Sequence, residues 1–180
     1  MKIDFPLNFI KTTSFAETKN LLNKVLLNEK RYILITGKTK SRDISEELFL
    51  GLDNCPFVKS CIDDNNQNEI KKLYNEVINK NIECIVAVGG GVVNDLAKRL
   101  AFLLKIKLIT VPTIISNDGM ASPIAVVTIG NKKKSLPASL PKTIIACSDI
   151  IKDAPKFYLD AAILDILSNI SALNDWDLFD

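Results

Sequence analysis

The chain has 180 residues, enough to bury the core of one typical domain, and its 47% hydrophobic and 24% charged residues exclude a disordered, collagenous or membrane-embedded chain. The 23 basic and 21 acidic residues leave a net charge of +2, which gives no indication of nucleic acid or an anionic membrane as a partner. Histidine is absent from the 180 residues, which removes the commonest general base and the commonest metal ligand.

The cysteines and the N-terminus indicate the cellular compartment of the protein. The four cysteines form no Cys-x-x-Cys pair, and the start from Met1 to Pro6 lacks the apolar run of a signal peptide. No apolar stretch reaches the roughly 18 residues of a spanning helix, because glycines interrupt the longest one, around 85–93. We therefore expect a cytoplasmic protein with reduced thiols and no membrane span.

The first third of the chain predicts alternating helices and strands. Residues 14–17, Ser-Phe-Ala-Glu, have the pattern of a capping box, in which the serine accepts from an early backbone N–H and the glutamate reaches back. An apolar-periodic helix follows it. Residues 32–36 predict a strand buried on both faces, 42–50 a helix, and 58–62 a weaker strand. A polar turn at 63–66 then leads into a charged helix.

The clearest strand covers 85–88 and runs through three glycines into an apolar-periodic helix over 92–104. Another strand, 108–111, stops at Pro112. Helices alternate with strands at connection lengths that suit right-handed βαβ crossovers. The pattern predicts an α/β fold with a mostly parallel, Rossmann-like sheet and flanking helices, and ligands of such folds bind beyond the carboxyl ends of the strands.

Beyond Pro112 the pattern changes. Residues 125–129 and 135–138 predict a hairpin, with 130–134 as its tip, and 143–146 predict one more strand. The three lysines at 132–134 are expected at a solvated tip, with attraction of a phosphate as the alternative. Apolar residues at helical spacing from about Pro155 onward predict a final helix.

Three segments are candidates for carrying chemistry. Gly89-Gly90-Gly91 before a helix could cradle a phosphate, because glycines allow close approach and the first-turn N–H groups carry the positive end of the helix dipole. The spacing fits neither G-x-G-x-x-G nor the Walker A pattern, and a tight turn explains it equally well. The loop 113–123 carries hydroxyls and a carboxylate. These side chains could contact a substrate, and the alternative is that they only form hydrogen-bonded turns. Asp165, on the final helix, fits a solvated face better than a ligand role.

Taken together, these segments resemble sn-glycerol-1-phosphate dehydrogenases. That family belongs to the wider group of iron-containing alcohol dehydrogenases, glycerol dehydrogenases and 3-dehydroquinate synthases. The resemblance runs in order along the chain through Gly89 to Lys98, Val111-Pro112-Thr113, Ser116 to Gly119, Ala121-Ser122-Pro123, Ala154-Pro155, and Asp165 with Ser168-Asn169 and Ala172 to Trp176.

The resemblance implies an NAD(P)-binding α/β domain over 1–152 and the start of a truncated all-helical domain over 153–180. It implies that the cofactor pyrophosphate is held by a turn made of Gly90, Gly91, Val92, Val93, Asn94 and Asp95. It places Thr113, Ser116 and Ser122 around the nicotinamide half of NAD or NADP. Asp118 would meet the substrate and Asp165 would be the metal-binding aspartate, both as catalytic residues.

In that chemistry a divalent metal, usually zinc, polarises the substrate oxygen during hydride transfer, and the expected reaction converts dihydroxyacetone phosphate to glycerol 1-phosphate. The family's other two metal ligands are histidines, which this chain lacks, so the site is incomplete here.

We therefore expect the cofactor-binding half of a metal-dependent oxidoreductase that acts on a small phosphorylated polyol or ketone, and that forms a homo-oligomer or pairs with a missing C-terminal half. The alternatives are a non-catalytic remnant that binds a nucleotide or a partner protein, and a lyase of the 3-dehydroquinate synthase type.

Overall fold

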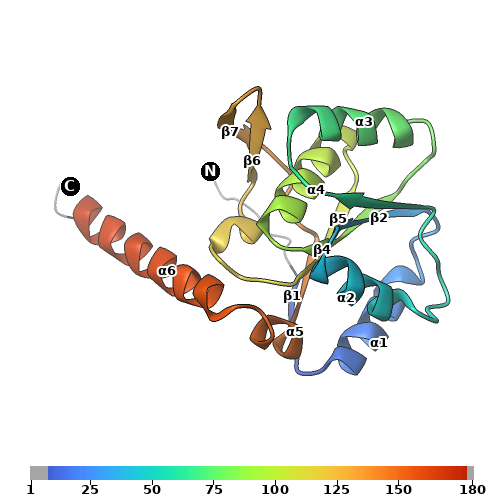
Figure 1. Cartoon of the computed structure of the whole chain (residues 1–180), viewed down its shortest axis with the longest axis horizontal. Helices are drawn as coiled ribbons and strands as arrows, with labels where there is room; N and C mark the ends of the chain where they lie inside the picture. The colour runs from blue at the N-terminus through green and yellow to red at the C-terminus, as the bar shows by residue number, and fades with distance from the viewer. Residues whose placement is uncertain (1–7, 178–180) are drawn as a thin grey trace.

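The computed structural model describes residues 8–177 and shows a sheet sandwiched between two layers of helices (Figure 1). Six strands pair in parallel in the order β1-β8-β5-β4-β2-β3. They are β1 (Asn8–Thr12), β2 (Tyr32–Gly37), β3 (Val58–Ile62), β4 (Cys84–Gly89), β5 (Lys107–Pro112) and β8 (Thr143–Cys147). The predicted parallel α/β sheet is confirmed.

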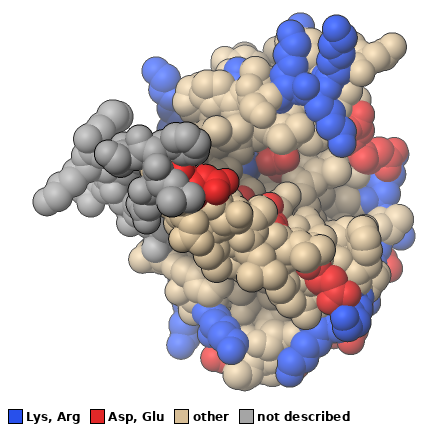
Figure 2. Space-filling model, turned by 90° about the vertical axis from the view of Figure 1, so that its left-hand side faces the viewer, with Lys and Arg blue, Asp and Glu red and all other residues tan. Residues whose placement is uncertain are grey.

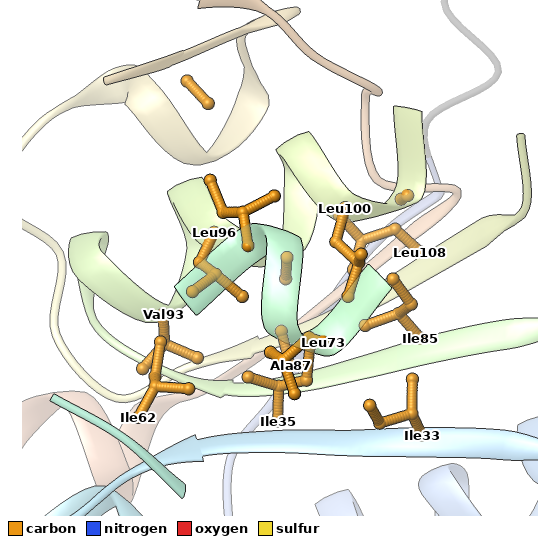
Figure 3. Packing of buried hydrophobic residues seen from close by; sticks show 14 of the residues in the cluster. Ile33, Ile35, Ile62, Leu73, Ile85, Ala87, Val93, Leu96, Leu100 and Leu108 are labelled. Atoms are coloured by element: carbon orange, nitrogen blue, oxygen red, sulfur yellow. The ribbon is translucent and has the colours of Figure 1, made fainter. Parts of the chain in front are cut away.

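The helices cover both faces of this sheet. They are α1 (Phe15–Leu26), α2 (Lys40–Phe49), α3 (Gln67–Val77), α4 (Gly91–Leu104), α5 (Ser148–Lys152) and α6 (Lys156–Asp177). One apolar core lies between the sheet and α3 and α4, and a second between the sheet and α1, α2 and α5. Figure 3 shows the first core, in which Leu96 and Leu100 of α4 pack above Ile85 and its neighbours.

The continuous apolar runs of the central strands follow from this sandwich. In β2, Ile33 and Ile35 point into the first core, whereas Tyr32 and Leu34 point into the second. All six residues of β4 are buried for the same reason. A strand with helices on both faces has no side on which a polar residue could reach water.

Three elements have no counterpart in the sequence prediction: the edge strand β1, the short 3-10 helix η1 (Asp118–Ala121) and the short helix α5. Strand β1 lacks an apolar run because it pairs only with β8, at the edge of the sheet, and three of its five residues are exposed. The capping box of α1 is confirmed in its serine half, since Ser14 Oγ accepts from the Glu17 N–H at 3.2 Å. The Glu17 carboxylate accepts from the Thr13 N–H at 2.7 Å, and this bond lowers its pKa.

The predicted hairpin is present as β6 (Ile124–Ile129) and β7 (Lys132–Pro137), which pair antiparallel and pack on α4. The prediction for its tip was wrong. Only Gly130 and Asn131 connect the strands, because the positive φ of 60° at Gly130 allows a tight reversal. The three lysines at 132–134 instead form the exposed start of β7.

The strand order reverses between β2 and β4: the chain moves to one side for β3 and to the other for β5 and β8. Such a reversal opens a crevice at the carboxyl ends of the two strands, where ligands of open α/β sheets bind. Here those ends are Gly37 and Gly89, and α4 starts at the same place.

Helix α6 extends away from the body of the molecule (Figure 1). Ala162 is its one buried side chain among the described residues, and its contact with the body is made at a short 3-10 helix, η1 (Asp118–Ala121). No helix within residues 8–177 is both long and apolar enough to cross a bilayer. The division of the chain at residue 152 stays a prediction.

Candidate functional site

The N-terminus of α4 is open to solvent at the switch in strand order. Gly90 is the N-cap and forms no side-chain capping bond, so the first-turn N–H groups, which have no intrahelical acceptor, face outward with the positive end of the helix dipole. A Cβ built on Gly91 would meet no atom within 4 Å, whereas one on Gly90 would lie 2.6 Å from Ile114 Cδ1. Gly90 therefore serves close packing, and Gly91 leaves space for a ligand.

Two pockets meet at Gly91. A smaller one of about 120 Å³ lies between α4 and the loop after β5, and its lining includes Asn94, Asp95, Ser116 and Ser122. A larger one of about 270 Å³ lies over the ends of β2 and β4, lined by Gly37, Lys38, Asp63, Gly90, Val92 and Val93, among others. Figure 2 views the molecule from the side on which α6 projects and shows this face hollowed, with acidic side chains inside the hollow.

The structure brings most of the predicted cofactor residues together. Gly90, Gly91, Val92, Val93, Asn94, Asp95, Ser116 and Ser122 all line one or both pockets. Thr113 lines neither pocket. It is buried behind the glycine turn, where its N–H donates to the Gly89 carbonyl at 3.1 Å.

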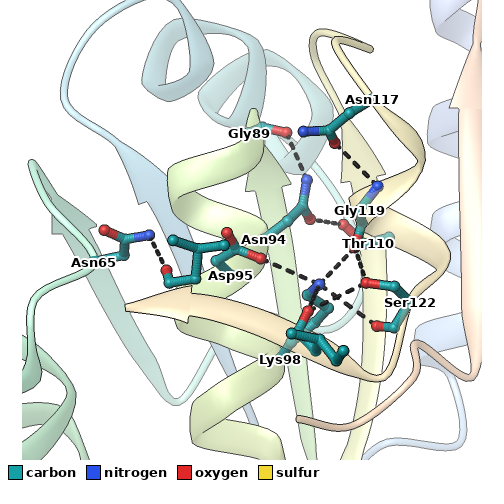
Figure 4. Close-up of polar contacts among 11 residues, drawn as sticks. Asn65, Gly89, Asn94, Asp95, Lys98, Thr110, Asn117, Gly119 and Ser122 are labelled. Carbon is teal, nitrogen blue, oxygen red and sulfur yellow. Dashed lines mark hydrogen bonds and ion pairs between the residues drawn. The ribbon is translucent and has the colours of Figure 1, made fainter. Parts of the chain in front are cut away.

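The side chain of Asn94 is hydrogen-bonded within the protein. Its side-chain amide donates to the Gly89 carbonyl at 3.2 Å, and its carbonyl oxygen accepts from the Thr110 hydroxyl (Figure 4). These bonds join α4 to the end of β4 and to β5. Asn94 therefore fixes the shape of the glycine turn, and its polar atoms have partners without a ligand.

Asp95 and Lys98 form an ion pair on the next turn of α4, with 3.1 Å between Oδ1 and Nζ. Burial raises the pKa of the Asp95 carboxyl, and the Lys98 ammonium opposes this shift. Lys98 itself is buried, and its Nζ also donates to the carbonyls of Gly119 and Ile124. The loop that bears Ser122 is therefore fastened to α4.

The two predicted catalytic aspartates are neighbours. The backbone N–H of Asp118, on η1, donates to Asp165 Oδ2, on α6, at 3.1 Å. The Asn117 side chain caps η1 by accepting from the Gly119 N–H at 3.0 Å. The structure thus brings Asp118 and Asp165 together beside the loop that lines the smaller pocket, although neither residue lines that pocket.

The described residues do not complete a metal site by themselves. Within the part of the chain that the structure describes, no three His, Cys, Asp or Glu side chains gather closely enough to hold one. A catalytic zinc site takes three protein ligands, and Asp165 offers one carboxylate that already accepts a backbone N–H. We derive no step through a metal from these residues.

Sequence reasoning missed three residues of this region. Ile114 packs on Gly90 and lines both pockets. Lys38 and Asp63 follow β2 and β3 and form an ion pair at the rim of the larger pocket. The available signal was a charged residue directly after each of two strands. The sequence does not say that these two strands pair, so it could not bring the two charges together.

Comparison with known proteins decides the family. A family model described as iron-containing alcohol dehydrogenase matches residues 9–155. The chain belongs to this family. Within the family, it is 41% identical over 162 residues to a glycerol-1-phosphate dehydrogenase [NAD(P)+] of Methanococcus aeolicus, covering 88% of this chain and 44% of the relative. A protein of the same description from Pyrococcus horikoshii is 42% identical over 111 residues, which are 62% of this chain and 32% of the relative.

Solved structures of dehydrogenases share the fold. Glycerol dehydrogenase from Schizosaccharomyces pombe superposes with a TM-score of 0.76 at 22% identity, over 89% of this chain and 42% of that one. An iron-containing alcohol dehydrogenase from Thermotoga maritima gives 0.74 at 18% identity, over 91% and 52%. The chain therefore spans about half the length of the family members that it matches.

Proposed function

We propose that this chain is the cofactor-binding half of an NAD(P)-dependent oxidoreductase that reduces dihydroxyacetone phosphate to glycerol 1-phosphate. The observation that carries the proposal is the open first turn of α4 at Gly91, with a pocket on either side. The named relatives are glycerol-1-phosphate dehydrogenases that use NAD(P)+, which supports the choice of cofactor and substrate.

In this proposal the pyrophosphate lies on the N–H groups of Gly91 to Val93, where the helix dipole stabilises an anion. The nicotinamide half occupies the smaller pocket beside Ser116 and Ser122, and the adenosine half extends over the larger pocket. When bound, the cofactor supplies the hydride, and the protein supplies position and exclusion of water.

The ion pair between Lys38 and Asp63 stands where the adenosine ribose would end. A carboxylate accepts hydrogen bonds from ribose hydroxyls, and a cation suits the 2′-phosphate of NADP. The Asp63 carboxylate raises the pKa of Lys38, so the ammonium stays charged. A rim that carries both groups supports the use of either cofactor.

Asp118 and Asp165 mark the proposed substrate side. We propose that Asp165 is one ligand of a divalent metal, zinc being the family expectation, and that the remaining ligands come from outside the described residues. The large apolar side chains along α6 support a further helical segment or a second copy of the chain as their cover, because most of them are about half exposed or more.

The test is a fluorescence titration of the 180-residue chain with NADH and with NADPH. Both should bind, and Gly91→Val should weaken both by at least about tenfold, because the added side chain fills the space above the first turn. Gln67→Val is the matched control, since it puts the same side chain at the first residue of α3. It should leave both affinities unchanged.

Absence of binding by folded wild-type chain would overturn the proposal. The second candidate function, a non-catalytic module that binds a nucleotide, is favoured by the single carboxylate at the metal position. Metal-dependent turnover of dihydroxyacetone phosphate by this chain, alone or mixed with a separate helical half, would exclude that candidate.

A further inference from the structure

Lys98 is among the most deeply buried side chains of the protein, with 1% of its surface exposed. Buried lysines are rare because removing the ammonium from water costs several kcal/mol unless it is fully paired. Here the three N–H donors have partners in Asp95, the Gly119 carbonyl and the Ile124 carbonyl, and the Ser122 carbonyl lies 3.5 Å away (Figure 4).

The carbonyls around Lys98 belong to one segment. Residues 119–124 run from η1 into β6, and their chain bends so that three carbonyls converge on the ammonium (Figure 4). The same segment contributes Gly119, Met120, Ser122 and Ile124 to the smaller pocket. Its shape, and therefore the shape of that pocket wall, depends on the Lys98 ammonium.

Lys98 reaches this segment from the helix whose first turn forms the proposed phosphate cradle. It lines neither pocket, so it has no direct contact to offer a ligand. We propose that Lys98 is a positioning residue, which holds the 116–124 loop against α4 so that the loop forms the wall for the nicotinamide half of the cofactor. This inference rests on the proposed binding of NAD(P).

The neighbouring Arg99 provides a matched control. Arg99 Nη1 donates to the Pro137 carbonyl at 2.7 Å, on the strand that pairs with β6 and outside the 116–124 loop. The backbone carbonyl of Lys98 accepts from the Ser139 N–H at 3.2 Å, and this bond remains when the side chain changes. Replacement of the Lys98 side chain therefore releases the loop but keeps the hairpin attached.

The experiment compares NADH with ADP-ribose, which has the pyrophosphate but no nicotinamide, by calorimetric titration. Lys98→Met should weaken NADH by about tenfold or more, because the loop no longer presents a fixed wall. It should change the affinity for ADP-ribose by less than about twofold, since the glycine turn is intact. Arg99→Met should change neither affinity. Amide hydrogen exchange over 116–124 should be faster in Lys98→Met than in either other protein.

Equal weakening of both ligands, or an unchanged affinity for NADH, would overturn the inference. Should Lys98→Met fail to fold, the wild-type chain gives the answer: NADH should slow exchange over 116–124 and ADP-ribose should not, and equal effects would contradict the positioning role. If the wild-type chain binds neither ligand, the result counts against the proposed function. That outcome is distinct from a failure of the positioning role, which requires a wild-type chain that binds.

Discussion

Helices α4 and α6 have similar apolar content, but α4 is largely buried and α6 is largely exposed. In α4, seven of the 14 residues are buried between the sheet and the hairpin, and even an asparagine and a lysine on the inner face find partners there. In α6, only Ala162 is buried among the described side chains, and Leu164 and Trp176 are 65% and 76% exposed.

The difference shows that helical periodicity predicts a helix but not its partner. The inner face of α4 lies on β4 and under β6, so burial of its leucines stabilises the domain. The apolar residues of α6 also recur at helical spacing, but they remain exposed. An apolar helix face is stable when it is covered, which is the physical basis for the further helical segment proposed above.

Matched leucine substitutions should give the largest contrast between the two helices. Leu96→Ala removes a side chain with no exposed surface from the first core, so the free energy of unfolding should fall by about 2–5 kcal/mol. Leu164→Ala removes an exposed leucine side chain, and the free energy of unfolding should change by no more than about 0.5 kcal/mol. Urea unfolding followed by circular dichroism measures both.

A large destabilisation by Leu164→Ala would show that the chain already buries α6 in solution, for example against a second copy. The same two variants at several protein concentrations separate that case, because burial between copies makes the unfolding midpoint depend on concentration.

The buried core should also respond to alkaline pH. Burial raises the pKa of the Cys84 thiol from 9.0 to about 12, and it raises the pKa of the Tyr32 phenol too. The folded-state pKa of Cys84 lies above the unfolded one, so its contribution to stability is complete below about pH 9 and is lost as pH rises toward 12. The free energy of unfolding should therefore be lower at about pH 10.5 than at about pH 8.

Thiol labelling gives an independent check on the burial of Cys84. Cys55 is exposed, whereas Cys84 and Cys147 are buried, so a thiol reagent should modify Cys55 quickly and the two buried thiols only on unfolding. Cys84→Ala should flatten the alkaline fall in stability. An unchanged slope in that variant would assign the fall to other groups.

The contact between α6 and the body should contribute little to stability. Asp165→Ala removes the acceptor of the Asp118 N–H, an exposed hydrogen bond, and should lower the free energy of unfolding by less than about 1 kcal/mol. Exchange of the Asp118 amide, measured by NMR, should nevertheless become faster. Ser168→Ala is the control, because its hydroxyl donates only within α6, to the Asp165 carbonyl at 2.7 Å.

Much of the candidate site was predictable from local sequence. The strand at 85–88, the glycines after it and the helix from 92 indicated a cradle, and the structure places Gly91 open at that point. The role of Lys98 was not predictable, because its partners are carbonyls 21 to 26 residues further along the chain. One signal was present: Lys98 lies four residues after Asn94, on the inner face of the predicted helix.

The sequence by itself determined the parallel α/β fold, most of its strands and the resemblance to the family, because apolar runs, glycine turns and helix caps act over a few residues. Only the tertiary structure decided that Lys38 meets Asp63, that the Asp118 N–H meets Asp165, and that α6 leaves its apolar surface uncovered. These facts depend on strand order and on how distant segments pack, and neither is encoded in the spacing of neighbouring residues.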